Sequence, residues 1–475
     1  MKIILIWAGW TGMSGVAGIL TDLGYTHIIC IDSTQSELTD KLKAKGLTVI
    51  IGHGKHKIQL GDIVIYSEAT AECEEVLEAR KIMKANKKVM VILNYFQFLG
   101  EISKYFSTVG FTGTNGKSSS TALAIHTAKK LVPNFGLGIL WAIVPSFNIQ
   151  SYVINTQAKK DIKTIFDYIF TGKNFLSLDT GTSSLIKKRS FFVEACEYKR
   201  HFLYLDLDYA IITSLEFDHT DYYKDMKDYL SAFDQVISRT KYKVYVPKWL
   251  KTIVLSSHRS IVPSKIKEVA IKKIPFMHLR GKHNDLNGSL VVALIKELCT
   301  KSHVPCSMSQ IASQIKSFWG LRRRMEFLGK NGNGAKIFTD YGHMASSIEF
   351  GYLALKHKFP DKKLFVIFQP HQINRIVTGR KDFAKALNWY DKVMIYNIYA
   401  ARENINDFIS HKVFKKENIS TLDDLGNTFA KHCSGAYTTD FDSITKEIEQ
   451  TKKDTIIVVF SAGNIDYQLR KYFEK

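Results

Sequence analysis

The sequence predicts an α/β protein of three domains, and three observations support that prediction. A length of 475 residues corresponds to about three domains of roughly 150 residues each. Short β-rich apolar runs alternate with helical patterns, as they do in parallel sheets flanked by helices. Residues 110–118, GFTGTNGKS, follow one such run and fit the Gly-x4-Gly-Lys-Ser pattern of a phosphate-binding loop.

The domains are expected at residues 1–105, 106–321 and 322–475. The first and the last are predicted to be Rossmann-like. The central domain contains the phosphate-binding loop and a mainly parallel sheet. A hinge is expected near Leu321–Arg324, where the third domain begins.

The composition is that of an ordinary globular protein, with 45% hydrophobic and 23% charged residues. The net charge of +21 would suit a polyanionic partner such as nucleic acid. The lysines are scattered, however, which favours a lysine-rich surface and no nucleic-acid partner. Six cysteines lie far apart without a Cys-x-x-Cys pair, which argues against a zinc site or disulfide framework and indicates a reducing compartment.

Neither apolar segment that resembles a membrane or export signal fits that role. The N-terminal run after Lys2 continues into Gly12–Gly15 without a convincing cleavage site. The apolar stretch Phe135–Val144 is too short to span a bilayer and is stopped by Pro145. We expect a cytoplasmic protein without a membrane partner.

The first domain begins with a nucleotide-type βαβ unit. A strand at Lys2–Trp7, a helix at Met13–Leu23 and a strand at Ile28–Ile31 follow one another, and the second strand ends at Asp32. Further strands are predicted at Thr48–Ile51, Ile63–Tyr66 and Val89–Leu93, with a helix at Cys73–Ala85.

The glycine turn of this unit is incomplete. Gly9 and Gly12 are present, but Trp7 and Trp10 stand where further glycines are expected. The fingerprint alone is therefore a weak signal for nucleotide binding.

The central domain opens with the phosphate-binding loop. Backbone N–H groups of such a loop surround a phosphate, and the following helix directs its positive end toward it. Lys117 is expected to reach the outer phosphates, and the Ser118 hydroxyl to ligate Mg²⁺. The alternative is a glycine turn followed by an ordinary lysine. A strand before the loop and helical spacing after it favour binding of a nucleoside triphosphate.

Acidic residues follow two later strands of the same domain. The apolar run Phe191–Val193 ends at Glu194 and Glu197, which suits a second Mg²⁺ anchor or a water-mediated ligand. The strand Tyr209–Leu215 leads to Asp218–Asp221, with the pattern Asp-His-x-Asp. This cluster is expected to hold a metal or phosphate, and the alternative is a solvated loop with a helix cap.

Polar residues also precede a helix predicted at Leu290–Leu298. The segment Arg280–Asn287 would suit nucleotide contacts or a helix cap. In the third domain, polar side chains follow strands at the edge where ligands bind in parallel sheets, at Asp340–His343 and Gln369–His371. Each histidine alone could be a core residue, but the pair with Arg375 favours a site. The predicted strands are Lys336–Thr339, Leu364–Phe368, Val393–Ile395 and Ile456–Phe460.

Taken in order, these motifs resemble those of the Mur ligase family along nearly the whole chain, and within it those of the branch that adds L-alanine. The similar segments are Gly113–Ser118, Val193–Tyr198, Asp218–Asp221, Gly281–Asn287, Arg323–Glu326, Asp340–His343, Phe368–Arg375 and Ile398–Glu403. The resemblance implies ATP and Mg²⁺ as cofactors, and UDP-N-acetylmuramic acid and L-alanine as partners.

The same resemblance implies the site residues. ATP would be bound by Gly113, Thr114, Asn115, Gly116, Lys117, Ser118, Ser119, His283, Asn284, Arg324 and Asp340, and Mg²⁺ by Ser118, Glu194 and His219. The UDP-sugar would be bound by Gly9, Gly12, Ser14, Asp32 and Ser67, and the amino acid by Tyr341, His343, His371 and Arg375. Catalytic roles fall to Lys117, His219, His371 and Arg375.

Several residues depart from the family pattern. Trp7 and Trp10 replace glycines in the UDP-binding turn. Gln372 stands where an arginine is usual, Arg402 where a glycine is common, and Met344–Ala345 where His-Pro is usual. These changes cluster around the UDP turn and the amino-acid pocket, whereas the ATP residues are well preserved, apart from Asn115 in a place where histidine is more frequent.

The implied reaction activates a substrate carboxylate as an acyl phosphate, which an amine then attacks to give an amide. One alternative is the recycling ligase that adds the tripeptide L-Ala-γ-D-Glu-meso-diaminopimelate to the same nucleotide sugar. The segment Ile398–Ala401 favours the single amino acid. The others are a non-catalytic nucleotide-binding paralogue, a nucleic-acid-binding ATPase, and a folate polyglutamate ligase, which would not need the N-terminal unit. A monomer and a homodimer are both compatible with the sequence.

Overall fold

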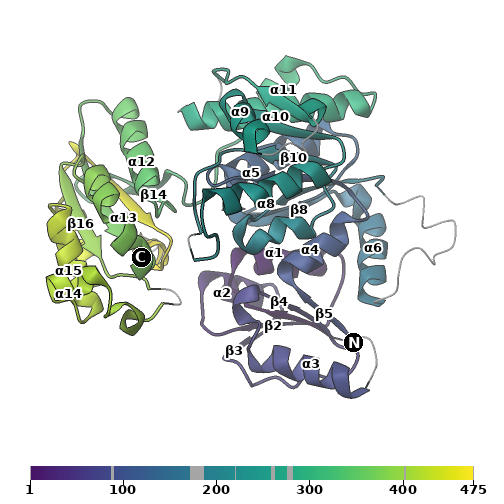
Figure 1. The fold of residues 1–475 in the computed structure, drawn as a ribbon, viewed down its shortest axis with the longest axis horizontal. Helices are drawn as coiled ribbons and strands as arrows, with labels where there is room; N and C mark the ends of the chain where they lie inside the picture. Colours follow the sequence, from purple (N-terminus) through teal and green to yellow (C-terminus); the bar gives the residue numbers. More distant parts are fainter. Residues whose placement is uncertain are drawn as a thin grey trace. The chain divides into compact units, whose positions relative to one another are not determined.

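The computed structural model describes residues 2–86, 90–171, 187–219, 221–257, 263–274, 282–400 and 403–473. The chain divides into two compact units, Met1–Gly320 and Leu321–Lys475. Within the described ranges, the strands form three sheets of 5, 7 and 6 strands. The predicted α/β class with mainly parallel sheets is thereby confirmed (Figure 1).

The first sheet is parallel and has the order β3-β2-β1-β4-β5. The chain builds outward from β1 to β3 and then returns to pair β4 with the other side of β1. The strand order therefore reverses beside β1, and a ligand crevice is expected at its carboxyl end. The strands are β1 (Ile3–Ile6), β2 (Ile28–Asp32), β3 (Thr48–Ile51), β4 (Ile63–Tyr66) and β5 (Val91–Asn94).

Helices cover both faces of this sheet. Figure 1 shows α3 (Glu74–Asn86) on one face, and α1 (Thr11–Asp22) and α4 (Tyr95–Ser103) on the other. In β1, Ile3 and Leu5 pack on the side of α1, whereas Ile4 and Ile6 pack on the side of α3. Because both faces are buried, the strand is apolar at every position. The remaining helix of this region is α2 (Glu37–Ala44).

The second sheet has the order β12-β11-β10-β6-β9-β7-β8, in which β7 and β8 are antiparallel and the other pairs are parallel. β6 lies between β10 and β9 and is parallel to both. The carboxyl ends of β10 and β9 therefore lie beside the loop that follows β6. The strands are β6 (Ser107–Thr112), β7 (Phe135–Val144), β8 (Gln150–Ile154), β9 (Ser190–Glu194), β10 (Tyr209–Ile212), β11 (Lys243–Pro247) and β12 (Ile266–Val269).

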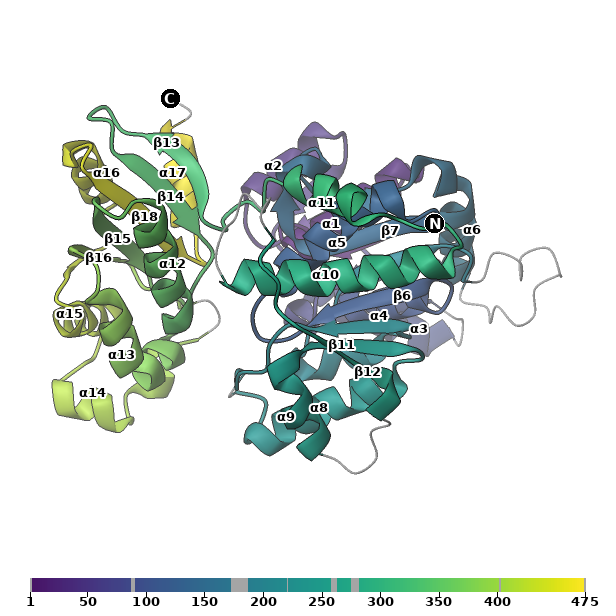
Figure 2. The ribbon, with the colours of Figure 1, turned by 90° about the horizontal axis from the view of Figure 1, so that it is seen from above.

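The helix after the phosphate-binding loop is covered by two later helices. α10 and α11 both pack against α5, and Figure 2 shows the long α10 beside it. The helices around this sheet are α5 (Lys117–Leu131), α6 (Lys159–Thr171), α8 (Met226–Arg239), α9 (Lys248–Ser257), α10 (Lys282–Lys301) and α11 (Met308–Lys316).

The first two sheets share one hydrophobic core. α1 packs against β7 and β8, where the Ser151 hydroxyl donates to the Thr11 carbonyl at 3.1 Å and the Tyr152 hydroxyl to Asp22 at 3.0 Å. Residues of β1, α1, α4, α6, β7 and β9 belong to a single buried cluster. The predicted boundary at residue 105 therefore falls inside one compact unit and stays a prediction.

Two predicted elements have wrong boundaries. β10 ends at Ile212 rather than Leu215, because the Thr213 and Ser214 side chains turn to bind the phosphate-binding loop. α10 begins at Lys282 rather than near Leu290, so residues 282–287, expected before the helix, lie within it. Asn284 and Asn287, in its first two turns, are buried. Arg280 and Gly281 lie outside the described residues. None of the described helices is long and apolar enough to cross a bilayer.

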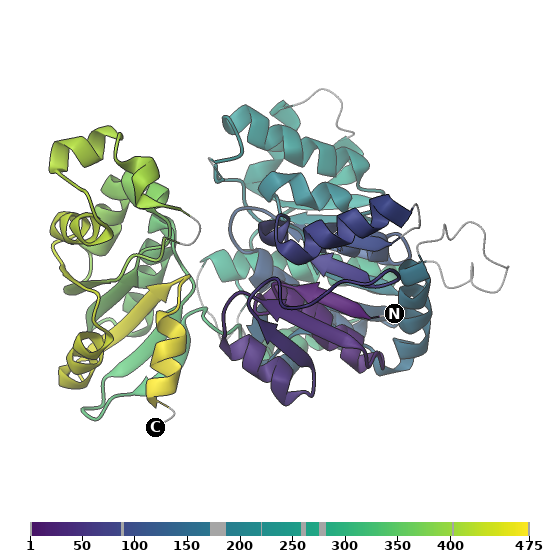
Figure 3. The same cartoon turned by 90° about the horizontal axis from the view of Figure 1, so that it is seen from below.

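The C-terminal unit contains the third sheet, in the order β13-β14-β18-β15-β16-β17. β13 and β14 are antiparallel and the other pairs are parallel. Helices cover both of its faces, as the green-to-yellow part of Figure 3 shows. The strands are β13 (Glu326–Lys330), β14 (Lys336–Asp340), β15 (Lys363–Gln369), β16 (Lys392–Tyr396), β17 (Ala436–Thr438) and β18 (Thr455–Ser461). The helices are α12 (Ala345–Lys358), α13 (Ile373–Leu387), α14 (Lys412–Glu417), α15 (Leu422–His432), α16 (Phe441–Gln450) and α17 (Ile465–Phe473).

Candidate active site

The phosphate-binding loop joins β6 to α5 in a conformation that requires glycine. Gly113 and Gly116 have φ angles of 121° and 88°, which L side chains rarely adopt. A Cβ on Gly116 would also lie 2.7 Å from Oδ1 of Asn287 on α10. The end of β10 braces the loop, since the Asn115 N–H donates to the Ser214 hydroxyl at 2.7 Å and the Thr114 hydroxyl to the Glu216 carbonyl at 2.7 Å. These contacts fix the loop at the start of α5.

Lys117, Glu197 and His219 come together beside this loop. Nζ of Lys117 lies 2.8 Å from Oε1 of Glu197, and Nε2 of His219 lies 3.6 Å from the same oxygen. The Glu197 side chain is 1% exposed. Lys117 also donates to the carbonyl oxygens of Gly113 at 2.6 Å and Thr114 at 3.2 Å. The ammonium is therefore held in the loop by three acceptors.

The charges of this group stabilise one another. Burial disfavours the charged form of Lys117, but attraction to Glu197 outweighs it and raises the pKa of Lys117 above its ordinary value. Burial likewise opposes the charged form of Glu197, yet Lys117 and His219 lower the pKa of Glu197 below its ordinary value. Burial raises the pKa of the neighbouring Cys196 thiol well above its ordinary value, which disfavours its thiolate form.

A second contact joins the helix start to the end of β9. The Ser118 hydroxyl donates to Oε1 of Glu194 at 2.8 Å, and the backbone N–H of Trp141 donates to Oε2 at 3.0 Å. Glu194 is 2% exposed. Both carboxylate oxygens are therefore fixed by neighbours on different elements.

The donor set fits Mg²⁺. Ser118, Glu194 and Glu197 offer the hydroxyl and carboxylate oxygens that this ion prefers. Oε2 of Glu197 is buried and makes no hydrogen bond to any residue that the structure describes, which is costly unless a cation approaches it. The predicted set of Ser118, Glu194 and His219 thus gains Glu197. In the sequence, Glu197 is a second acidic residue three positions after Glu194, the end of β9. The fold decides that Glu197, rather than Glu194, pairs with Lys117.

The other predicted ATP residues lie on two different units. Ser119 lies in the first turn of α5. His283 and Asn284 lie in the first turn of α10, with their side-chain nitrogens 3.0 Å apart. In the C-terminal unit, Asp340 accepts from the N–H groups of Met325 at 2.8 Å and Gly342 at 2.7 Å. Arg324 stacks over the Tyr341 ring at 5.6 Å.

The predicted UDP-sugar residues surround the turn between β1 and α1. The Asp32 carboxylate accepts from the N–H groups of Gly9 at 2.8 Å and Thr34 at 3.0 Å, which fixes the turn. The Ser14 hydroxyl donates to the Thr11 carbonyl at 3.0 Å. Ser67, at the end of β4, caps a short 3₁₀ turn by accepting from the Ala69 N–H at 3.4 Å. The structure brings Gly9, Gly12, Ser14 and Asp32 together, while Ser67 follows the adjacent strand.

The two tryptophans of this turn adopt unusual positions. Trp7 has a φ of 72°, a conformation that a bulky residue rarely adopts. The Trp10 ring packs over Gly12, where a Cβ would lie 2.7 Å from it. Trp10 also lies 4.7 Å from Tyr95 and 5.6 Å from Trp141, measured between ring centroids. The turn thus has a positive φ at Trp7, where glycine is expected, and the indole rings of Trp7 and Trp10 lie beside it.

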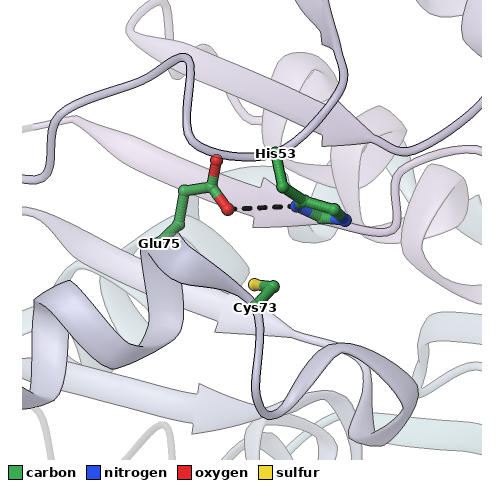
Figure 4. A group of neighbouring side chains, drawn as sticks. All are labelled: His53, Cys73 and Glu75. Carbon is green, nitrogen blue, oxygen red and sulfur yellow. Dashed lines mark hydrogen bonds and ion pairs between the residues drawn. The ribbon is translucent and has the colours of Figure 1, made fainter.

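Another polar cluster lies beside the first sheet. Among the residues that the structure describes, His53, Cys73 and Glu75 bring candidate metal-ligand atoms within 4.8 Å of one another (Figure 4). Glu75 already uses both oxygens, because Nδ1 of His53 lies 3.0 Å from Oε2 and the Gly54 N–H donates to Oε1 at 2.7 Å. The cluster therefore anchors the loop after β3 to the start of α3.

In the C-terminal unit, the predicted amino-acid residues gather at the carboxyl ends of β14 and β15. The rings of His343 and His371 lie 5.6 Å apart, and those of Tyr341 and His343 also 5.6 Å apart. Nη1 of Arg375 lies 3.3 Å from Nδ1 of His371. Nδ1 of His343 lies 3.0 Å from the Tyr341 carbonyl. All four predicted residues therefore form one group.

Helix α13 begins inside this group. Gln372 is its N-cap and has a φ of 71°. The Glu403 carboxylate accepts from the backbone N–H groups of Ile373 and Asn374 and so occupies the positive end of the helix. Met344 is the N-cap of α12 and makes no side-chain cap. Arg402, a departure noted in the sequence, lies outside the described residues.

Comparisons with known proteins agree with this arrangement. The Mur ligase middle domain matches residues 111–248, the segment that contains Lys117, Glu194 and His219. A UDP-N-acetylmuramate–L-alanine ligase of Clostridium botulinum is 28% identical, in an alignment that covers 96% of this chain and 94% of that protein.

Two solved structures share the fold. The UDP-N-acetylmuramate–alanine ligase MurC of Thermotoga maritima superposes with a TM-score of 0.72 at 19% identity, over 100% of this chain and 98% of that one. A murein peptide ligase of Psychrobacter arcticus gives 0.62 at 18% identity, over 99% and 98%. At these identities the likeness concerns the fold, including its three sheets.

Proposed function

We propose that this chain, which belongs to the Mur ligase family, is an ATP-dependent ligase that joins L-alanine to the carboxylate of UDP-N-acetylmuramic acid. The observation that supports it most is the arrangement of Lys117 and Ser118 with Glu197 and Glu194, inside the segment that the family's middle domain matches. Similarity to L-alanine ligases along nearly the full length supports the choice of substrates. As part of this proposal, the enzyme acts in the cytoplasm as a monomer or homodimer.

The first step is phosphoryl transfer to a carboxylate. An unactivated carboxylate is a poor electrophile, so its oxygen attacks the γ-phosphorus of ATP, the bond to the β-phosphate oxygen breaks, and an acyl phosphate and ADP result. Such transfer depends mostly on positioning and charge neutralisation. Lys117 supplies a fixed positive charge at the loop. Two Mg²⁺ ions held by Ser118, Glu194 and His219, together with Glu197, would supply further neutralisation of phosphate charge.

The second step is attack by the amine of the amino acid on the acyl carbon, which expels phosphate and leaves an amide. The amine must lose a proton during this attack. Arg375 is always protonated and therefore donates to Nδ1 of His371, so this nitrogen's lone pair is engaged. His343 differs, because a carbonyl only accepts: its Nδ1 carries the proton and its Nε2 carries the lone pair. His371, His343 or water serves as the base in this proposal, and Arg375 is suited to hold the amino-acid carboxylate.

Coupled release of ADP tests the proposal. Mg·ATP and UDP-N-acetylmuramic acid are incubated with L-alanine, L-serine, glycine or the tripeptide in turn, with Lys117→Ala as the blank. Turnover that requires L-alanine and disappears in the variant supports the proposal. Turnover with the tripeptide alone replaces it with the recycling ligase. ATP binding without ADP release for any acceptor would leave a non-catalytic nucleotide-binding protein.

A further inference from the structure

We propose that Trp10 and Trp141 form an aromatic platform that binds the sugar ring of the acceptor and positions its carboxylate beside Glu194. The inference rests on the proposed function, because it takes the acceptor to be a carboxylated sugar linked to a nucleoside diphosphate. It adds two residues to the site described above. Trp10 is the N-cap of α1, and Trp141 lies on β7 of the second sheet.

The Trp10 ring is fixed from three directions. It lies over Gly12 of its own helix, so closely that a Cβ there would be 2.7 Å away. Its centroid is 4.7 Å from that of Tyr95 on α4, in an edge-on arrangement, and 5.6 Å from that of Trp141 on β7. Trp10 is nevertheless half-buried rather than enclosed. A fixed aromatic ring with an accessible surface can bind a ligand without first being ordered.

Trp141 connects this ring to the phosphate-transfer site. Its indole Nε1 donates to the Tyr95 hydroxyl at 3.2 Å, and its backbone N–H donates to Oε2 of Glu194 at 3.0 Å. The Phe96 ring lies 5.7 Å away and extends the aromatic surface. Trp141 is also half-buried. The same residue therefore contacts both Trp10 at the nucleotide turn and the carboxylate that binds Ser118.

The position of these rings matches one part of the acceptor. The diphosphate is expected at the start of α1, where backbone N–H groups and the helix dipole favour an anion. The reacting carboxylate must lie near Ser118 and Glu194, where phosphoryl transfer is proposed. What lies between the two ends of the acceptor is its sugar. Trp10 is the N-cap of α1, at the first of these places, and the Trp141 N–H donates to Glu194 at the second, while the two rings lie 5.6 Å apart.

The chemistry of a sugar suits such a surface. A pyranose ring presents C–H groups on its faces, and burying them against an aromatic ring removes apolar area from water. The rings would thus hold a neutral part of the acceptor, while charged groups act at its two ends. The competing interpretation is a packing cluster that stabilises the turn without touching a ligand.

Binding of three UDP compounds separates these interpretations. UDP, UDP-N-acetylglucosamine and UDP-N-acetylmuramic acid are titrated against the wild type, Trp10→Phe, Trp10→Leu and Trp141→Leu. Trp249→Leu is the control, because that side chain is 50% exposed on α9. Thermal unfolding confirms that each variant is folded.

If the platform binds the sugar, Trp10→Leu and Trp141→Leu weaken both UDP-sugars by about ten-fold or more, leave UDP unchanged, and keep the KM for ATP. Trp10→Phe retains part of the affinity. Equal loss for UDP and the UDP-sugars, or no loss at all, overturns the inference in favour of packing.

The proposed function fails in a different way from the platform. If UDP-N-acetylmuramic acid binds through the tryptophans but no amino acid gives ADP, the ligase proposal fails and the platform stands. If turnover with L-alanine is normal and the tryptophan variants bind all three compounds as the wild type does, the platform fails and the ligase proposal stands. If the folded wild type binds none of the three compounds, both are overturned.

Discussion

Two glycine turns in this protein follow the central strand of a parallel or mainly parallel sheet and precede a helix, yet they are built differently. The phosphate-binding loop keeps glycine at its positive-φ positions and gathers charged side chains, chiefly Lys117 and Glu197. The turn between β1 and α1 has Trp7 at a positive φ and gathers indole rings, with Asp32 as its buried acid. Charged side chains surround the phosphate-binding loop, whereas aromatic rings surround the turn between β1 and α1.

The difference teaches what each turn has to do. Phosphoryl transfer changes the charge on the reacting atoms, so a turn that supports it needs fixed charges close by. A turn that only holds a substrate needs backbone donors for an anion and a surface for the rest of the molecule. Substitution of glycine by tryptophan is therefore compatible with a binding turn and would not be compatible with the phosphate-binding loop.

The largest expected effect follows from removal of the charge at the phosphate-binding loop. Lys117→Ala is expected to lower the rate of ADP release by at least about 10²–10³-fold, as loss of a fixed charge stabiliser does elsewhere. Binding of UDP-N-acetylmuramic acid should stay within about two-fold of the wild type, because the other turn is untouched. Coupled kinetics and a UDP-sugar titration measure the two quantities. A comparable loss in both would contradict the division of labour between the turns.

Alanine in place of one glycine in each turn sharpens the comparison. Gly116→Ala forces a side chain into a φ of 88° and against Asn287, so ATP affinity should fall by at least about ten-fold. Gly12→Ala pushes against the Trp10 ring at 2.7 Å, so UDP-sugar affinity should fall while ATP affinity is kept. Titration of each variant with both ligands checks this.

Gly24→Ala is a matched control for Gly116→Ala, because Gly116 has a φ of 88°. Gly24 has a φ of 89°, and an added Cβ meets nothing within 4 Å. It therefore carries the backbone strain without a clash near either turn. Loss of ATP affinity in Gly24→Ala equal to that in Gly116→Ala would mean that strain alone explains the effect.

The ion pair of the phosphate-binding loop should make stability depend on pH. Glu197 has its pKa lowered from 4.5, so its stabilising contribution is complete above pH 4.5 and is lost as the pH falls through the folded value. Lys117 has its pKa raised from 10.5, so its contribution is complete below pH 10.5 and is lost as the pH rises through the folded value. Between these limits, Glu197→Gln should destabilise the protein by on the order of 3 kcal/mol, because it leaves a buried ammonium without its partner.

Urea unfolding at neutral and acidic pH measures this difference. The gap between the wild type and Glu197→Gln should narrow as the pH falls below 4.5. Glu216→Gln is a control, because Glu216 is exposed and accepts from Asn115 at 3.0 Å. A gap that stays constant with pH would mean that Glu197 stabilises the loop through packing rather than charge.

Much of this architecture could be predicted from the sequence. The predicted strands are all present with small shifts at their ends, because buried parallel strands are continuous apolar runs that stand out between polar loops. Lys117, Ser118 and Glu194 could also be predicted to lie together, since the ends of parallel strands meet at one edge of a sheet.

The parts that escaped prediction depend on long-range packing. The start of α10 was missed because Asn284 and Asn287 have low helix propensity, and only contact with α5 explains them there. The Glu403 cap of α13 joins residues about thirty positions apart. In the sequence, Trp10 indicated only an incomplete glycine turn. Its contacts with Tyr95 and Trp141 could not be predicted, because those residues come from other parts of the chain.

The smallest expected effect, and the most informative about the second turn, is that of Trp7→Gly. Glycine removes the cost of the positive φ, about 1–2 kcal/mol. It also removes the ring contact with Trp10, at a centroid distance of 6.1 Å, which is worth about 0.5–1.5 kcal/mol at most. The two changes oppose each other and partly cancel in the free energy of unfolding. Thermal and urea unfolding measure that change, and a UDP-sugar titration accompanies them. Unchanged stability with weaker binding means that the strain at Trp7 is retained for the substrate, as strained residues at functional sites usually are. A loss of several kcal/mol with unchanged binding would mean instead that the indoles of this turn serve the fold.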